Sequence, residues 1–366
     1  MTEEILYVPV LKGKEGELAA LEVLHPSIRA KIVPLIELPP VPFDHAKKTK
    51  AKTDTEHLDG IASRLSKFSF RQPLYVHIGW QDSSEQIEEV GGYAHGFLTK
   101  LRLTNIDAIP VVTFQSSQSY MEAAVQHAGA ASSGFCLRMR MRDFKEEIDQ
   151  EQELNRIQQA LGLRDASAMD LVIDLEDLGT SPEYGLHTAR SIFSILPRAD
   201  KFQWRRMILT AASFPKDLSD RDAATTFLQE RKEWNLWLAL QRKPGALPTR
   251  DLIYGDYAIS NPITKDLDPK KMVMSANIRY TSDQDWLILK GRSVRKYKFD
   301  QYFQLCEALV TRKEFCGGDF SWGDRFIEQC ALAMQGPGNA TTWRKVGVNH
   351  HLTFVATKLA KLSHGV

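Results

Sequence analysis

The stretch Asp170-Leu-Val-Ile-Asp-Leu-Glu-Asp177 decides the fold of this chain. Its apolar residues predict a buried strand, and Asp174, Glu176 and Asp177 give that strand an acidic C-terminal end. Similar apolar segments with polar ends recur at Tyr7–Lys12, Ile32–Glu37, Leu74–Trp80, Ile109–Gln115, Phe135–Arg140 and Met207–Ser213. Helical patterns or long connections lie between them, and such an alternation favours an α/β fold.

An eighth strand at Leu252–Ala258 completes the series. The helices expected along this part of the chain are Glu17–Leu24, Glu56–Phe68, Glu85–Leu101, Tyr120–Ala128, Asp143–Leu161, Leu186–Leu196 and Ala223–Leu240. Eight strands over roughly 260 residues match the count and size of a (β/α)₈ barrel, the TIM-barrel type. An open doubly wound sheet is the alternative. No Gly-x-Gly-x-x-Gly follows the first strand and no Walker motif occurs, so its common nucleotide-binding forms have no support.

The sequence changes in character after residue 262. Ser275–Tyr280 and Asp285–Lys290 flank a Thr-Ser-Asp-Gln turn and predict a β-hairpin. Helices are expected at Lys298–Thr311, at Arg325–Met334 and, as a short final helix, around and after His351. We therefore divide the chain into a barrel at 1–262 and a C-terminal extension at 263–366 packed on it.

Composition points to a globular, cytoplasmic protein. Of the 366 residues, 43% are apolar and 25% are charged, which is ordinary for a globular chain. No run of about 18 uncharged apolar residues is present, so no membrane span is expected. The acidic start Met-Thr-Glu-Glu-Ile does not resemble a secretory signal. The four cysteines show no Cys-x-x-Cys spacing, which favours reduced thiols, and a net charge of +1 excludes a globally basic surface.

The C-terminal ends of barrel strands converge on one mouth, where the sites of such folds lie. Strand position predicts nine polar residues there: Lys12, Glu37, His77, Gln115, Arg138, Arg140, Asp174, Glu176 and Asp256. Asp174 and Glu176 lie two apart and share one face of a regular strand. With Glu37, they offer oxygen ligands for a divalent cation such as Mg²⁺ or Mn²⁺. Lys12 and an arginine would offset a phosphate or carboxylate, so the set suits metal-assisted phosphoryl chemistry.

An alternative stays open, because acids beside lysines and arginines at a barrel end also form structural ion-pair networks. For Arg138 and Arg140, pairing with the acids is favoured over substrate contact. His350 and His351 are adjacent and cannot face the same way, so one of them, His350, is the candidate to reach a site while the other packs. No His-x-x-x-His, Gly-x-Ser-x-Gly or His-Glu-x-x-His motif occurs, so a histidine zinc site or a nucleophilic serine lacks support.

The loop Gly317–Asp324 is the most distinctive motif of the chain. Gly317 and Gly318 before a helix start can present backbone N–H groups to an anion. Arg325, Trp343, Arg344 and Lys345 lie nearby in sequence and, with Arg279, predict an anionic partner such as a nucleotide or nucleic-acid strand, because aromatic and cationic residues suit stacking and phosphate contact. The alternative is a tight turn with an Asp helix cap and tryptophans that pack the tail. The basic run Lys290–Lys298 attracts anions but is also typical of a solvated face.

Several blocks together resemble the phage and prophage beta protein family. They are Tyr7–Lys12, Pro34–Glu37, Gly255–Tyr257, Ile278–Thr281 with Trp286, Gly317–Asp324, and Trp343-Arg344 through His350-His351. The resemblance covers almost the whole chain in the same order. It implies phage exclusion or antiviral defence, with a phage protein, a nucleic acid or a co-encoded defence protein as partner, and it supplies no catalytic residues. We expect either a binding protein that uses its barrel mouth and C-terminal loops, or a metal-dependent phosphodiesterase or nuclease.

Overall fold

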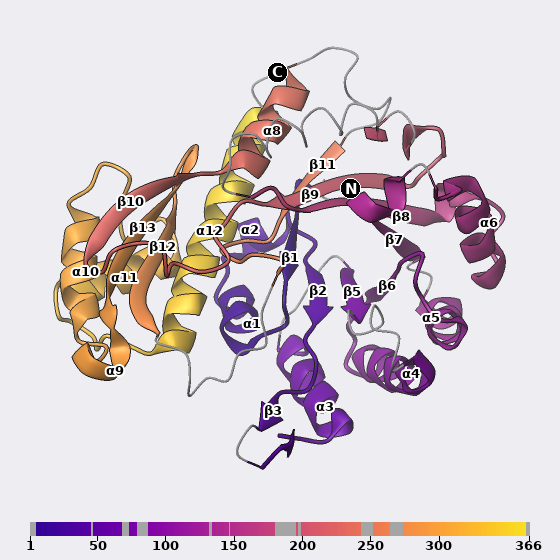
Figure 1. The fold of residues 1–366 in the computed structure, drawn as a ribbon, viewed down its shortest axis with the longest axis horizontal. Coiled ribbons are helices and arrows are strands. Elements are labelled where there is room, and N and C mark those ends of the chain that lie inside the picture. The colour runs from indigo at the N-terminus through magenta and orange to yellow at the C-terminus, as the bar shows by residue number, and fades with distance from the viewer. Residues whose placement is uncertain are drawn as a thin grey trace.

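Eight parallel strands close into a barrel in the order β1-β2-β5-β6-β7-β8-β9-β11 (Figure 1). The computed structural model describes residues 5–44, 47–67, 73–78, 87–131, 134–145, 147–179, 195–196, 199–242, 252–263 and 274–363. The strands are β1 Tyr7–Leu11, β2 Leu35–Leu38, β5 Leu74–Ile78, β6 Ala108–Val112, β7 Phe135–Arg140, β8 Met169–Asp177, β9 Arg206–Ala212 and β11 Leu252–Asp256. The (β/α)₈ prediction is confirmed. The doubly wound alternative is wrong, because β1 pairs with β11 and leaves no edge.

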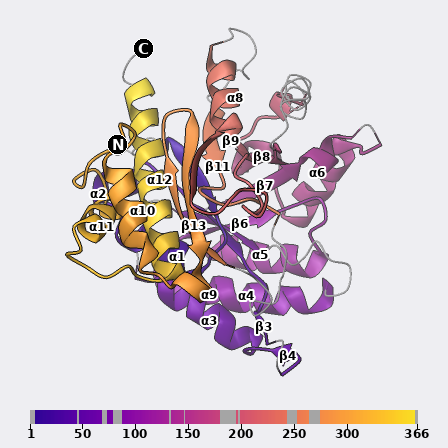
Figure 2. The same cartoon turned by 60° about the vertical axis from the view of Figure 1, so that its left-hand side comes forward.

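The helices of this part surround the barrel wall (Figures 1 and 2). They are α1 Glu15–Glu22, α2 Pro26–Arg29, α3 Asp54–Leu65, α4 Ile87–Leu103, α5 Gln118–Ala131, α6 Gln150–Ala160 and α8 Lys232–Gln241. Local sequence sets their starts: Thr53 and Glu56 form a capping box before α3, and Asp149 caps α6. The short strands β3 Phe43–Asp44 and β4 Thr49–Lys50 pair with each other. Most of the predicted helix Leu186–Leu196 lies outside the described residues.

Strand alternation divides the core into two layers. One residue in two points into the barrel, and the inner apolar residues are Val8, Val10, Leu35, Tyr75, Ile109, Val111, Cys136, Val172, Ile208 and Ala212. Their neighbours along each strand pack outward against the helices. The same alternation decides which polar residues at the strand ends can reach the mouth. At β11 the observed alternation differs from the predicted one.

The C-terminal unit contains an antiparallel sheet in the order β10-β13-β12. Its elements are β10 Thr225–Glu230, β12 Ser275–Thr281, β13 Asp285–Ser293, α9 Val294–Tyr297, α10 Gln301–Val310, α11 Trp322–Ala331 and α12 Ala340–Ser363. The predicted hairpin is confirmed as β12 and β13. The predicted helix Ala223–Leu240 is wrong in its first half, because β10 pairs along its length with β13. The Thr-Thr-Phe sequence of β10 favours a strand.

The final helix α12 holds the two parts of the molecule together. It spans 24 residues, whereas a short helix was expected. It lies between the barrel and the C-terminal sheet (Figure 1) and contacts α1, α11 and β12. Because neighbours surround it, Val346 through Ala356 are all buried. In the described part of the chain, no helix combines the length and apolar character needed to cross a membrane.

Candidate functional site

Arg138 is the centre of a buried polar cluster at the barrel mouth and is 1% exposed. Its Nε and Nη2 donate to Oδ2 of Asp174 at 3.0 and 2.7 Å, and its Nη1 donates to Oε1 of Glu37 at 3.1 Å. Nη1 also donates to Nδ1 of His77 at 2.7 Å, and Nη2 to the hydroxyl of Tyr257 at 2.5 Å. That hydroxyl donates in turn to Asp174 at 2.7 Å. Arg138 therefore links its own strand, β7, to β2, β5 and β8 and to the segment after β11.

The electrostatics of this cluster favour the charged forms of Glu37 and Arg138. Burial acts to raise the pKa of Glu37, but the charge of Arg138 outweighs it and lowers that pKa well below its usual range. Burial lowers the pKa of His77, so the ring is neutral and its Nδ1 accepts from Arg138. Burial opposes the charge of Arg138, whereas Tyr257 and the two carboxylates raise its pKa. The result is a network of charge-assisted hydrogen bonds in which the charged groups are paired with other members of the cluster.

The predicted metal ligands Glu37, Asp174 and Glu176 do not form a cation site. The guanidinium of Arg138 lies where the cation was expected, bonded to both Glu37 and Asp174. The register of β8 shifts between Asp174 and Asp177, and Glu176 has a φ of +54°. At this irregularity the Glu176 side chain is 42% exposed and lies 3.7 Å from Arg140. Over the described residues, no group of three or more His, Cys, Asp or Glu side chains could hold a metal ion.

Two other predicted mouth residues are engaged locally. Lys12 is 7% exposed, and its Nζ donates to the carbonyl of Pro262 at 2.9 Å. Burial lowers the pKa of Lys12, an effect that Glu37 and Glu17 oppose. The amide of Gln115 donates to Asp143 at 3.1 Å. Both side chains therefore help to fix loops at the rim of the barrel.

Asp256 was predicted at the mouth, and this prediction is wrong. Tyr254 and Asp256 face outward, whereas Tyr257 faces inward and joins the Arg138 cluster. Outside the barrel, Asp256 accepts hydrogen bonds from Tyr7 at 2.5 Å and Tyr254 at 3.0 Å. Nε2 of His351 lies 3.0 Å from the same carboxylate. Asp256 thus joins β1, β11 and α12, and sequence analysis missed Tyr257 because the alternation was assigned one residue out of step.

His350 was predicted to reach the site, but it is buried in the C-terminal unit. Its Nδ1 lies 2.8 Å from Oδ2 of Asp324, and its Nε2 lies 2.9 Å from the carbonyl oxygen of Thr281. The ring stacks on Tyr280 with a centroid separation of 3.8 Å. Nδ1 of His351 lies 2.9 Å from Oγ1 of the same Thr281. The two adjacent histidines therefore hold the end of β12 from two sides.

The structure brings the predicted anion-binding residues Arg279 and Arg344 together. Both donate to the carbonyl of Ile259, at 2.9 and 3.4 Å, and Arg344 also donates to Ser260 at 3.0 Å. The guanidinium of Arg279 packs over the ring of Phe214 at 4.6 Å. These contacts fix the chain that follows β11 to the C-terminal unit. Both arginines therefore have a structural role.

The predicted glycine cradle faces an acid. Gly317 has a φ of +87°, as a tight turn requires, but the space beside Gly318 is filled by the carboxylate of Glu328. An anion would be repelled there. Ser321 caps α11, because its hydroxyl accepts from the backbone N–H of Asp324 at 3.1 Å. The alternative of a tight turn with a helix cap therefore describes this loop, but the capping residue is a serine and not an aspartate.

A groove of about 770 Å³ lies on the C-terminal unit. Four separate segments form it: β10, the β12–β13 turn, the loop after α10, and the last turns of α12. Its lining residues are Leu228, Ser282, Asp283, Gln284, Asp285, Lys313, Glu314, Phe315, Cys316, Phe320, Phe354, Thr357, Lys358 and Lys361. Sequence analysis named the hairpin turn and the loop that contains Phe320, but it did not bring these segments together. The volume is in the range of small-molecule or peptide sites.

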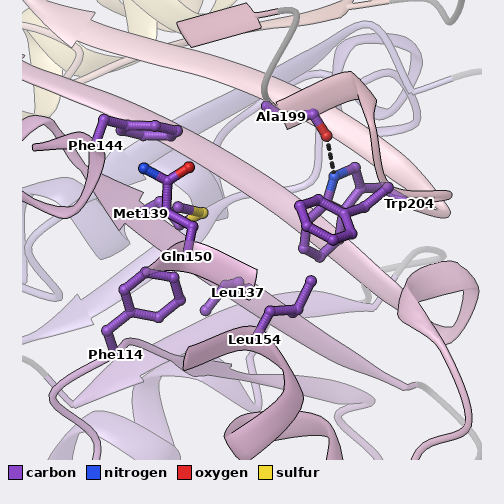
Figure 3. Close-up of a pocket in the computed structure, with 9 residues that line it drawn as sticks. Phe114, Leu137, Met139, Phe144, Gln150, Leu154, Ala199 and Trp204 are labelled. Atoms are coloured by element: carbon purple, nitrogen blue, oxygen red, sulfur yellow. Dashed lines mark hydrogen bonds between the residues drawn. The ribbon is translucent and has the colours of Figure 1, made fainter. Parts of the chain in front are cut away.

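A second cavity is too small for a ligand. It lies between β7, α6 and the segment around Trp204, and apolar side chains such as Phe114 and Phe144 surround it (Figure 3). Its volume of about 10 Å³ is roughly that of one water molecule. The indole of Trp204 donates across this region to the carbonyl of Ala199 at 2.8 Å. It is a packing defect of the core.

The closed parallel barrel and its sheet-and-helix extension define the class of this molecule, a TIM-barrel-like α/β protein with an elaborated C-terminal unit. A family model described as Beta protein matches residues 7–357. The chain therefore belongs to the Beta protein family, as the resemblance of its motifs indicated. A comparison with curated proteins gives no significant match.

Proposed function

We propose that this chain is a cytoplasmic phage-exclusion or antiviral-defence protein that acts by binding a phage protein. The groove on the C-terminal unit carries the proposal. It is the larger of the two cavities described above, and it combines apolar and charged side chains. The barrel serves as a rigid support, since its polar cluster is bonded internally.

Binding is favoured over hydrolysis by the chemistry of the mouth. A metal-dependent phosphodiesterase needs acids that are available to a cation. Here Asp174 is 0% exposed and accepts from Arg138 and Tyr257, while Glu37 accepts from Arg138. The alternative activity therefore has no supporting cluster among the described residues.

The balance of charge in the groove favours a protein over a nucleic acid. Three lysines and three acids line it: Lys313, Lys358, Lys361, Asp283, Asp285 and Glu314. Nucleic-acid grooves present mainly cations to the phosphates. Leu228, Phe320 and Phe354 add apolar surface, which suits the side chains of a peptide segment.

The test is plating efficiency of a phage panel on bacteria that express the full chain. We expect protection against at least one phage, and its loss in Leu228→Glu, because Leu228 is 51% exposed in the groove. Leu332→Glu is the matched control, since Leu332 is 65% exposed and lies outside the groove. Both variants are expected to fold, because exposed substitutions usually change stability by only about 0.5 kcal/mol.

Two outcomes would overturn the proposal. One is full protection by the Leu228→Glu variant. The other is Mg²⁺- or Mn²⁺-dependent hydrolysis of a phosphodiester such as bis(p-nitrophenyl) phosphate that disappears in Glu37→Gln. The second result would establish the enzymatic alternative instead.

A further inference from the structure

Two like charges oppose each other beside the groove, and one of them, Asp285, lines it. Glu230 of β10 and Asp285 of β13 are directly paired in the antiparallel ladder. Such a pair is destabilising. Burial and the charge of Glu230 raise the pKa of Asp285, against the effect of Arg231. Within the described part of the chain neither carboxylate has an ion pair, and the carboxylate of Glu230 accepts a hydrogen bond from the amide of Asn235 at 2.9 Å.

The face of β10 beside these acids is uncovered. Leu287 and Leu289 of β13 are buried beneath the helices, at 0% and 1% exposed. The helical layer ends before β10, so Thr226 and Leu228 are exposed on the same sheet. Leu228 is one of the few large apolar side chains described as exposed, and it lines the groove with Phe320 and Phe354. An exposed apolar surface therefore lies beside the two acids.

The remaining charges of the groove are distributed unevenly. Asp283 pairs with Lys358 across the groove wall. Lys313 and Lys361 are exposed, and they belong to the segment that follows α10 and to the end of α12. Asp285 therefore faces a like charge, Glu230, in the paired strands, whereas Asp283 is paired with a lysine.

We propose that this groove binds a protein segment that places a lysine or arginine side chain between Glu230 and Asp285 and an adjacent apolar side chain on Leu228, Phe320 and Phe354. The inference rests on the proposed function of the groove and adds the chemistry of its partner. A cation bonded to both carboxylates removes their repulsion, so relief of a native-state conflict contributes to binding. The apolar neighbour covers surface that the helices leave exposed.

The experiment titrates the full chain with two peptides and follows backbone amide shifts by NMR. The probes are Ala-Lys-Leu-Phe-Lys-Ala and Ala-Glu-Leu-Phe-Glu-Ala, both capped at each end. We expect the lysine peptide to bind at least about tenfold more tightly, equivalent to about 1.4 kcal/mol. Glu230→Gln combined with Asp285→Asn should abolish this preference. Asp220→Asn combined with Asp222→Asn is the control, because these exposed acids precede the same strand and lie outside the groove.

Folding does not confound this test. The neutral double variant removes a repulsion, so its thermal midpoint should equal or exceed that of the unmodified chain. Equal binding of both peptides, absence of binding by the lysine peptide, or a preference that survives the double variant would each overturn the inference. If Leu228→Glu still abolishes phage protection in that case, the proposed function stands alone. If the peptide preference holds and Leu228→Glu protects fully, the proposed function fails alone.

Discussion

Replacing Arg138 with methionine tests whether the barrel mouth is a structural cluster. Methionine approximates the length of the arginine stem and removes every donor of the guanidinium. Asp174, which is 0% exposed, and Glu37 would then be left in the barrel without their cation. Breaking a buried ion pair by removing one partner costs about 3–5 kcal/mol.

The sum of individual hydrogen bonds would overstate this loss. Arg138 makes five contacts to acceptors in the cluster. At about 1.5–3 kcal/mol for each charge-assisted bond, the total of roughly 7.5–15 kcal/mol would be as large as the whole stability of a typical domain. The lower estimate of about 3–5 kcal/mol applies, because water solvates these groups in the unfolded chain. Adding Asp174→Leu to Arg138→Met should therefore recover part of the loss, since the double variant removes a buried unpaired charge.

The assay is urea unfolding followed by circular dichroism at several pH values. The pKa of Glu37 is lowered in the folded chain, so its contribution is present above the unfolded pKa of about 4.3 and is lost as pH falls. The unmodified chain should lose stability in that acid range more steeply than Arg138→Met. A loss smaller than about 1 kcal/mol in Arg138→Met, with unchanged acid dependence, would refute the assignment of this cluster as a source of stability.

Three further perturbations probe separate parts of the molecule by the same unfolding assay. Thr281→Val removes the hydroxyl that bonds His351 and should cost about 1–3 kcal/mol, while Thr281→Ser should retain stability; equal stability of both would contradict the role of this contact. Burial raises the pKa of Glu233 to about 7, so stability should fall as pH rises from about 4.3 to 7, and Glu233→Gln should remove that slope; a persistent slope would assign it to another group. Gly16→Ala places a carbon 2.7 Å from a side chain of α12 and should cost about 1–3 kcal/mol, whereas Gly60→Ala meets no atom within 4 Å and should gain about 1 kcal/mol; a neutral Gly16→Ala would show that α1 and α12 can separate.

The barrel was predictable because each strand carries its own signal. Apolar runs with polar ends identified all eight strands, since burial on both faces leaves little room for other residues. The strand β10 lacked this signal. Its Thr225 and Thr226 follow two alanines, and the helical pattern of α8 extended the predicted helix backward over it. Its strand conformation depends on pairing with β13, about 60 residues away, which no local window reveals.

The candidate site was predictable only in part for a similar reason. Convergence of Glu37, Arg138 and Asp174 followed from the barrel alone, and the ion-pair alternative describes what they do. The direction of Asp256 depended on alternation within one strand, where an error of one residue reverses the face. The groove could not be predicted, because its lining comes from four segments that only the folded C-terminal unit brings together.

The position of α12 has a consequence for biosynthesis. His351 bonds the carboxylate that joins the first and last strands of the barrel, and Asn349 donates to the carbonyl of Ala20 at 3.2 Å. These contacts come from residues translated after every barrel strand. During synthesis on the ribosome, the junction between β1 and β11 therefore lacks the contact from His351 until α12 has emerged. A nascent chain released before that point would expose Tyr7 and Asp256 together.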